Sequence, residues 1–222
     1  MTTLIFIRHA QSEGNLKGIC SGQIDFPLVE KGFAQAQKTA DYLRAIYPIT
    51  AVYTSDLCRT AQTAQPTAEA FGLVPIADPR FREVCVGEWD GQPWSLLKET
   101  YPEIHATWTN YIMDRNTPRP KGAECREEVL ERVSAAIGDV IKACQGGCVA
   151  IFCHSRMIRV LADYWRQFDK ELDEEMTQRK IKGFHSCSVT VAEYDDDGTF
   201  LRAPLCCYRS FLQENSNVVA PE

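Results

Sequence analysis

The stretch Leu4-Ile5-Phe6-Ile7-Arg8-His9-Ala10 decides the fold of this 222-residue chain. Its apolar run contains β-branched residues and ends at a basic pair, which is typical of a strand buried in a parallel sheet. Residues 9–29 are rich in glycine and polar side chains and are interpreted as a loop. Open parallel sheets bind their ligands beyond the carboxyl ends of their strands. Arg8 and His9 therefore stand where a site is expected.

Predicted strands and helices alternate along most of the chain. The strands are expected at 51–54, 74–76, 148–152 and 186–194, with another from residue 199, and the helices at 31–46, 57–71, 123–144 and 156–166. This alternation favours an α/β fold, a three-layer α/β/α sandwich around a mostly parallel central sheet. No repeat, low-complexity tract or long linker divides the sequence, so we expect a single domain over residues 1–222.

Residues 80–121 depart from this alternation. They contain the tryptophans Trp89, Trp94 and Trp108 and several prolines, but no strong strand. We expect a small helical insertion that covers the core as a lid, with its tryptophans packed inside it. The segment 82–125 would then form the rim of a site at the strand ends and decide which substrate binds.

The composition excludes several classes of protein. The net charge is −6 and the pI about 5.3, so we expect no nucleic-acid partner, which would need a basic face. No apolar run approaches the roughly 18 residues of a membrane-spanning helix. Residues 1–6 lack the basic start of a signal peptide, which favours a cytoplasmic protein, and the ten cysteines are interpreted as reduced thiols. Their spacing includes no Cys-x-x-Cys pair, so no metal site is predicted.

Three strand ends carry residues suited to one kind of chemistry. Arg8-His9 follows the first strand, the run from Ser55 to Arg59 follows the second, and His154 follows a later one. Guanidinium groups match phosphate oxygens, a neutral histidine can attack phosphorus, and a second histidine can stabilise the oxygens as charge shifts. A carboxyl group is then needed to protonate the leaving oxygen, and Glu83 and Glu88 are the candidates.

These residues and their order resemble the histidine phosphatase superfamily, in its phosphoglycerate-mutase-like branch. The resemblance covers most of the chain and rests on five motifs in the same order. They are Arg8-His9 with Asn15; the run from Gly22-Gln23 to Gly32, followed by Gln35-Ala36; Ser55-Asp56-Leu57-Cys58-Arg59-Thr60 with Thr63-Ala64; Glu83 with Gly87, Trp89 and Gly91; and His154 after a strand. The departures from the family pattern are Ala10 and Ser155, where many members have glycine, and residues 122–125.

The resemblance implies roles for the residues that carry it. The catalytic residues that it implies are Arg8, His9, Arg59, Glu83 and His154. The residues that it implies for binding the substrate phosphate are Arg8, Asn15, Gln23, Arg59, His154 and Ser155, the last through its backbone N–H. His9 would become a phosphohistidine, and Glu83, favoured over Glu88, would act as general acid and then as general base. No metal and no cofactor is implied, and the partner would be a small phosphorylated metabolite.

Three activities remain open at this point. The first is a phosphatase, the second a cofactor-dependent phosphoglycerate mutase that returns the phosphoryl group to another hydroxyl, and the third a non-catalytic phosphate-binding module. The insertion is short, which favours access of water to His9 and therefore the phosphatase. His105 and His185 are interpreted as surface residues. The basic residues of 179–182 are interpreted as a solvated face, with recruitment of an anionic substrate as the alternative. The substrate and the oligomeric state are left open.

Overall fold

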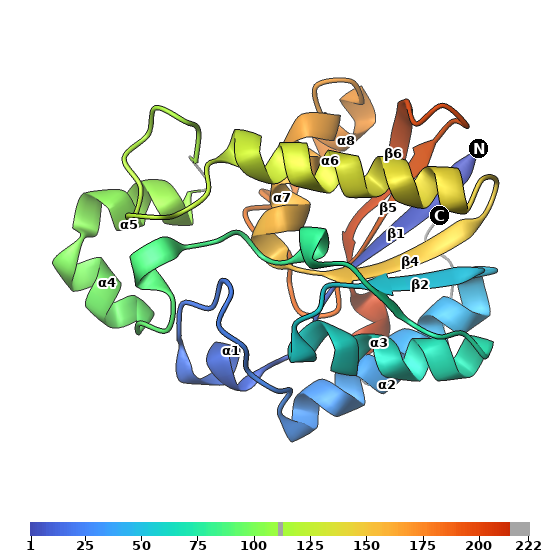
Figure 1. The fold of residues 1–222 in the computed structure, drawn as a ribbon, viewed down its shortest axis with the longest axis horizontal. Coiled ribbons are helices and arrows are strands. Elements are labelled where there is room, and N and C mark those ends of the chain that lie inside the picture. The colour runs from blue at the N-terminus through green and yellow to red at the C-terminus, as the bar shows by residue number, and fades with distance from the viewer. Residues whose placement is uncertain (111–112, 214–222) are drawn as a thin grey trace.

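A six-stranded sheet forms the middle layer of the protein (Figure 1). The computed structural model describes residues 1–110 and 113–213. The strands are β1 (Thr2–Arg8), β2 (Ala51–Thr54), β3 (Ile76–Ala77), β4 (Cys148–Cys153), β5 (Val189–Tyr194) and β6 (Phe200–Tyr208). They lie in the order β3-β2-β4-β1-β5-β6, and the first four in this order are parallel, while β5 and β6 add antiparallel pairs at one side. The mostly parallel sheet expected from the sequence is confirmed.

The helices follow the predicted positions to within a few residues. They are α1 (Glu13–Lys17), α2 (Glu30–Ile46), α3 (Cys58–Phe71), α4 (Trp94–Thr100), α5 (Pro102–Thr109), α6 (Arg126–Ala143), α7 (Ser155–Trp165) and α8 (Lys170–Gln178). Two differ from expectation, because α1 lies within the predicted loop 9–29 and α8 was not predicted. The Ser12 side chain caps α1 by accepting the N–H of Asn15, which lets five residues form a helix inside a polar segment.

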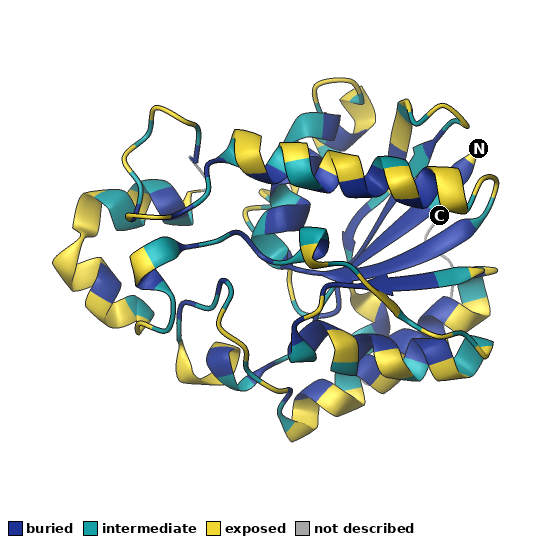
Figure 2. Ribbon diagram, viewed as in Figure 1, coloured by how far each residue is buried: buried dark blue, intermediate teal, exposed yellow. Residues whose placement is uncertain are grey.

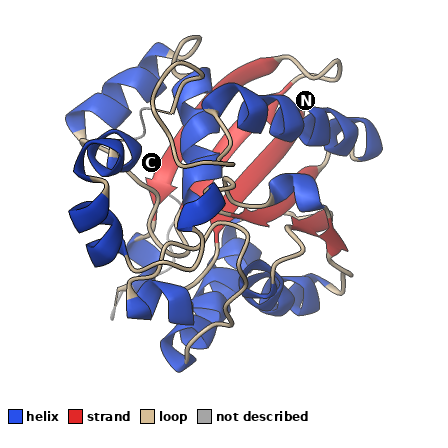
Figure 3. Cartoon of the chain, turned by 60° about the vertical axis from the view of Figure 1, so that its left-hand side comes forward, coloured by secondary structure: helices blue, strands red, loops and turns tan. Residues whose placement is uncertain are grey.

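Alternate residues of β1 face opposite helical layers. Leu4 and Phe6 belong to the core shared with α6 and α7, whereas Ile5 and Ile7 belong to the core shared with α2 and α3. Side chains of a strand alternate between the two faces, so a run of four apolar residues needs cover on both sides. Figure 3 shows helices on both faces of the sheet, and Figure 2 shows the strands buried between them. The three-layer α/β/α sandwich is confirmed.

The insertion expected at 80–121 is largely helical where it is described, and residues 111–112 lie outside the described part. It contains α4 and α5, which extend beyond the sheet (Figure 1). The Trp89 ring meets the rings of Trp94 and Trp108 edge to face, with centroids 6.4 and 6.2 Å apart. The predicted packing of these tryptophans within the lid is confirmed. Within 1–110 and 113–213, no helix is long and apolar enough to cross a membrane.

Candidate active site

The order of the strands brings the predicted loops together. β4 lies between β1 and β2, and the register pairs Arg8 with Cys153 and Thr54 with Phe152. All three strands run in parallel, so the residues that follow them emerge at one edge of the sheet. His9, Ser55 and His154 are these next residues, and they form the floor of the candidate site.

The neighbours of His9 fix the tautomer and the charge of its ring. Its ring Nδ1 lies 2.7 Å from the carbonyl oxygen of Ala10, which can only accept a hydrogen bond, so Nδ1 carries a proton. Burial, with the nearby charges of Arg8 and Arg59, holds the pKa of His9 well below its usual value. The ring is therefore neutral near pH 7, with a lone pair on Nε2. The side chain is 4% exposed, and it lines the cavity described below.

His154 lies next to His9 and is completely buried. The centroids of the two rings are 5.3 Å apart. Its Nε2 lies 2.8 Å from the Ser55 hydroxyl, which in turn lies 2.7 Å from the Thr60 hydroxyl. Burial, followed by the charges of Arg59, His9 and other cations, lowers the pKa of His154 well below the usual range. Its Nδ1 has no hydrogen-bond partner among the described residues.

Two arginines stand beside this pair of histidines. Arg59 is 1% exposed, and its terminal nitrogens donate to the carbonyl oxygens of Ile24 and Gly22, both at 2.9 Å. Its buried Nε has no acceptor within the described residues. Arg8 donates to the carbonyl oxygen of Phe184 at 2.6 Å. Both guanidinium groups line the same cavity as His9 and can present N–H donors to an anion there.

Glu83 reaches the N-terminus of α7 from the insertion. Its carboxylate accepts the N–H groups of Arg156 and Met157, both at 3.1 Å, and that of Val84 at 2.9 Å. The first N–H groups of a helix have no acceptor within the helix, so α7 has donors to offer. Glu83 is 8% exposed and lines the cavity, whereas Glu88 is exposed and is not among the lining residues. The geometry favours Glu83 over its rival.

The remaining predicted phosphate-binding residues, Asn15, Gln23 and Ser155, do not all lie in the cavity. Asn15 and Ser155 line the cavity. Gln23 does not: its side chain donates to the carbonyl oxygen of Glu83 at 2.7 Å and accepts from Arg82 at 3.1 Å. The expectation that Gln23 lines the phosphate pocket is therefore not met. Because both ends of its amide are bound within the protein, Gln23 supports the backbone of Glu83 instead.

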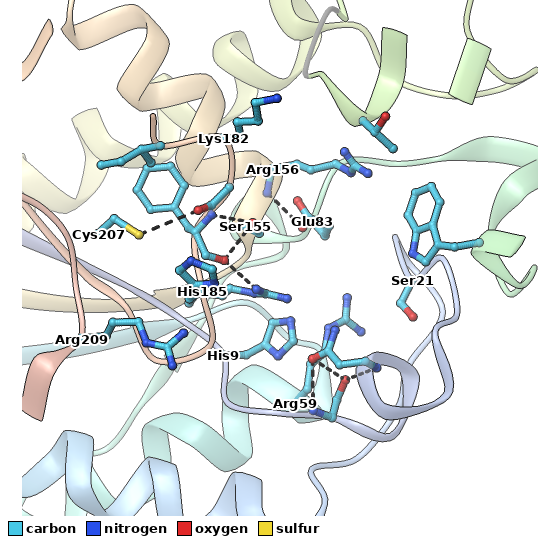
Figure 4. Close-up of a pocket in the computed structure, with 18 of the residues that line it drawn as sticks. His9, Ser21, Arg59, Glu83, Ser155, Arg156, Lys182, His185, Cys207 and Arg209 are labelled. Atoms are coloured by element: carbon cyan, nitrogen blue, oxygen red, sulfur yellow. Dashed lines mark hydrogen bonds between the residues drawn. The ribbon is translucent and has the colours of Figure 1, made fainter. Parts of the chain in front are cut away.

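The cavity has a volume of about 720 Å³ and is richer in positive charge than the sequence suggested (Figure 4). Its cationic lining residues are Arg8, Arg59, Arg156, Arg179, Lys180, Lys182 and Arg209. His105 and His185 also line it, His185 as the exposed residue that the sequence predicted and His105 partly buried. The basic residues of 179–182 are exposed, as expected of a solvated face, and they line the cavity as well. Sequence reasoning missed Arg156 and Arg209. Arg156 directly follows His154 and Ser155 in the sequence, which was the available signal.

The described residues offer no obvious metal centre. Within 1–110 and 113–213, no group of three or more histidine, cysteine or acidic side chains is arranged to hold an ion. The ten cysteines form no disulfide. Positive charge in the cavity comes from side chains, which can carry the negative charge of a bound phosphoryl group themselves.

Comparison with known proteins places the chain in a family. The model of the histidine phosphatase superfamily (branch 1) matches residues 4–204. A probable phosphoglycerate mutase GpmB of Enterobacter sp. (strain 638) is 32% identical over 154 residues, 69% of this chain and 70% of that protein. Phosphoserine phosphatase 1 of Hydrogenobacter thermophilus is 32% identical over 161 residues, 72% of this chain and 74% of that protein.

A solved structure agrees with these sequence relatives. Bacillus stearothermophilus YhfR superposes with a TM-score of 0.81 at 25% sequence identity, and the match covers 96% of this chain and 100% of YhfR. The family match spans nearly the whole sandwich, including both histidines and Glu83. The chain belongs to the histidine phosphatase superfamily, branch 1.

Proposed function

We propose that this protein is a phosphatase that hydrolyses a small phosphomonoester through a phosphohistidine on His9. The observation that carries the proposal is the state of His9: a buried, neutral ring with its proton on Nδ1 and its lone pair on Nε2. Such a nitrogen is a nucleophile toward phosphorus. It lies in a cationic cavity beside a second buried histidine, where a phosphoryl group would be attracted and held.

In the first step, His9 Nε2 forms a bond to phosphorus as the ester P–O bond breaks. Arg8, Arg59 and His154 stabilise the three peripheral oxygens while their charge changes. The Ser55 hydroxyl joins the Thr60 hydroxyl to His154 Nε2, at 2.7 and 2.8 Å, and thereby fixes the orientation of the His154 ring. Arg59 Nε is buried without a protein acceptor in the described residues, and a phosphoryl oxygen would fill this role.

Glu83 acts as general acid in the first step and as general base in the second. As a carboxylic acid it gives its proton to the departing alkoxide, and the carboxylate that remains then takes a proton from water. The oxygen of that water bonds to phosphorus, the P–N bond breaks, and His9 recovers its lone pair. Three backbone N–H groups fix the direction of the carboxylate, which lets one group serve both steps. No metal ion and no cofactor takes part in this scheme.

The alternative activity is that of a phosphoglycerate mutase, favoured by the name of the Enterobacter relative. Incubation with 3-phosphoglycerate and its bisphosphate separates the two. A phosphatase releases inorganic phosphate continuously, and we expect this result, with turnover of p-nitrophenyl phosphate as well. Conversion to 2-phosphoglycerate without release of phosphate would show a mutase. Absence of turnover on every ester, with phosphate still bound, would show a non-catalytic binding module.

A further inference from the structure

The cavity holds more positive charge than one phosphoryl group needs. Seven cationic side chains line it, and Glu83 is the one carboxylate among its described lining residues. The cavity thus gathers positive charge in a chain whose net charge is −6. A phosphomonoester brings a charge of about −1.5 to −2 at neutral pH. Arg8 and Arg59 stand beside His9 and can balance that charge, and Arg179 already pairs with Glu175. Four further cations line the cavity: Arg156, Lys180, Lys182 and Arg209.

Arg156 is the most firmly placed of these remaining cations. Its guanidinium carbon lies 5.3 Å from the centre of the Trp94 ring and 5.5 Å from that of Trp108, and one terminal nitrogen donates to the Trp108 carbonyl oxygen at 3.3 Å. Stacking on aromatic rings uses the flat faces of a guanidinium group, while its N–H groups point outward in its plane. The lid therefore presents Arg156 in a fixed orientation.

The position of Arg156 relates it to the leaving group. Its backbone N–H donates to the Glu83 carboxylate, so its side chain starts beside the proposed acid. A general acid must lie within hydrogen-bond reach of the oxygen that it protonates. The part of the substrate beyond that oxygen consequently passes this region. In Figure 4, Lys182 and Arg156 lie on the same side of the cavity as Glu83, while Arg209 lies on the other side.

Lys182 adds a second positive charge to this side of the cavity (Figure 4). It is exposed, lines the cavity, and forms no ion pair with an acidic side chain of the described residues. Many arginines elsewhere are paired, for example Arg132 with Glu124 and Arg202 with Glu193. An ammonium group on the same side of the cavity as an oriented guanidinium group (Figure 4) suits an oxyanion that both can contact.

We propose that Arg156 and Lys182 form a second anion subsite, which binds a carboxylate or phosphate carried by the leaving group of the substrate. This inference rests on the proposed phosphatase function and specifies its substrate class: phosphomonoesters whose alcohol is itself anionic. Arg156 supplies oriented N–H donors, and Lys182 supplies a second positive charge for the same group. Selectivity then arises on the side of the leaving group, away from His9.

Two matched pairs of substrates test this subsite. 3-Phosphoglycerate and glycerol 3-phosphate differ by a carboxylate, and fructose 1,6-bisphosphate and fructose 6-phosphate differ by a second phosphate. For the wild-type protein we expect kcat/KM to favour the anionic member of at least one pair by about tenfold or more, the usual scale of a charge-assisted contact. The pair that shows the preference identifies the oxyanion.

Two variants remove one charge each from the proposed subsite. Arg156→Met keeps a long side chain between the two tryptophans, and Lys182→Gln leaves the lid untouched. Each should lower the preference ratio by about five- to tenfold, mainly through KM. Tryptophan fluorescence checks that the lid of Arg156→Met is intact. Arg209→Gln, the control, removes a charge from the other side of the cavity and should lower both members of a pair alike, with the ratio unchanged.

Each outcome decides between the alternatives. No preference in either pair, or an unchanged ratio in either subsite variant, would overturn the two-cation subsite. A ratio that falls only in Arg209→Gln would place the second anion on the Arg209 side of the cavity and would equally overturn it. Turnover of p-nitrophenyl phosphate separates this failure from a failure of the proposed function: without any turnover by the wild-type protein, it is the phosphatase assignment that fails.

Discussion

His9 gains its proposed reactivity from its surroundings more than from its residue type. An ordinary exposed histidine is partly protonated near pH 6.5, and a protonated ring has no lone pair to offer. Here the Ala10 carbonyl oxygen holds the proton on Nδ1, while burial and two guanidinium groups keep a second proton off the ring. The same cations that would attract the substrate in the proposed mechanism also keep the His9 ring neutral.

This arrangement predicts a pH dependence with a defined sign. Because the folded-state pKa of His9 lies well below 6.5, the ring stays neutral as the pH falls through 6.5, and the attacking form is lost only below the lowered pKa. The unfolded chain does take up that proton near 6.5, so the folded state should lose stability as the pH falls below about 6.5. An NMR titration of the imidazole nitrogens checks the first statement, and urea unfolding at pH 7 and 5.5 checks the second. Titration of folded His9 at or above 6.5 would refute this explanation of its reactivity.

Glu83→Gln should separate two kinds of leaving group. The alkoxide from an alkyl phosphate is strongly basic and needs a proton, whereas p-nitrophenolate needs little help. We expect the variant to lose about 10²–10³ more rate on an alkyl phosphate than on p-nitrophenyl phosphate, the usual reach of general acid catalysis. Steady-state rates on both substrates measure this. The phosphoenzyme should also persist longer, because the same carboxylate activates water.

Glu88→Gln is the matched control for that change. Glu88 is exposed, lies in the same segment as Glu83, and is not among the residues that line the cavity. Its variant should behave like the wild-type protein on both substrates. Equal losses on both substrates in Glu83→Gln, without accumulation of phosphoenzyme, would mean that Glu83 only positions the substrate.

At the scale of elements, the loop 22–24 is clamped from two sides. Arg59 in α3 donates to the carbonyl oxygens of Gly22 and Ile24. From the insertion, the Asp90 carboxylate accepts the N–H groups of Gly22, Gln23 and Ile24 at 2.8 to 2.9 Å. The loop therefore joins Arg59, the proposed phosphate-binding arginine, to the lid, and we infer that Asp90 is a positioning residue that the sequence did not reveal.

Removal of this clamp should weaken both stability and activity. Asp90→Ala leaves three backbone donors without their acceptor, and since water can reach some of them we expect a loss of about 2 kcal/mol in the free energy of unfolding. Arg59 would lose a fixed partner, so kcat/KM for p-nitrophenyl phosphate should fall about tenfold. Urea unfolding and steady-state kinetics measure the two effects.

Asp139→Ala provides the comparison for Asp90→Ala. Asp139 is 59% exposed and pairs with Arg80, which is also bound by Asp78. Its loss should cost less than about 1 kcal/mol and leave kinetics unchanged, as is usual for surface ion pairs. If Asp90→Ala were as mild as this control, the clamp would have no part in holding Arg59.

For the whole molecule, the sequence predicted the layers better than the rim of the site. The apolar run of β1 and the helical spacing of α6 are local patterns, and each dictates which face is buried. Arg156 and Lys182 are different, because their place in the cavity depends on how the lid and the segment before β5 fold over the strand ends. Gln23 was misplaced for the same reason: its motif is local, but its partners, Arg82 and the Glu83 backbone, lie about 60 residues away.

The charge of the cavity predicts how the whole protein responds to chelators and to vanadate. Guanidinium groups and histidines carry the charge of the transferring group, so EDTA should not lower activity, whereas a metal-dependent phosphatase would lose it. Orthovanadate should inhibit, since five-coordinate vanadium resembles the transition state. Loss of turnover in EDTA with recovery on addition of Mg²⁺ would contradict the proposed chemistry.

The central claim is that the substrate phosphoryl group is transferred to His9. Rapid mixing with a ³²P-labelled phosphomonoester, followed by denaturation in alkali and mass spectrometry, measures that transfer directly. We expect an acid-labile, alkali-stable phosphate on His9 in the wild-type protein, more of it in Glu83→Gln, and none in a folded His9→Ala variant that has lost turnover. Full turnover by His9→Ala, or a phosphate on another residue, would contradict the account.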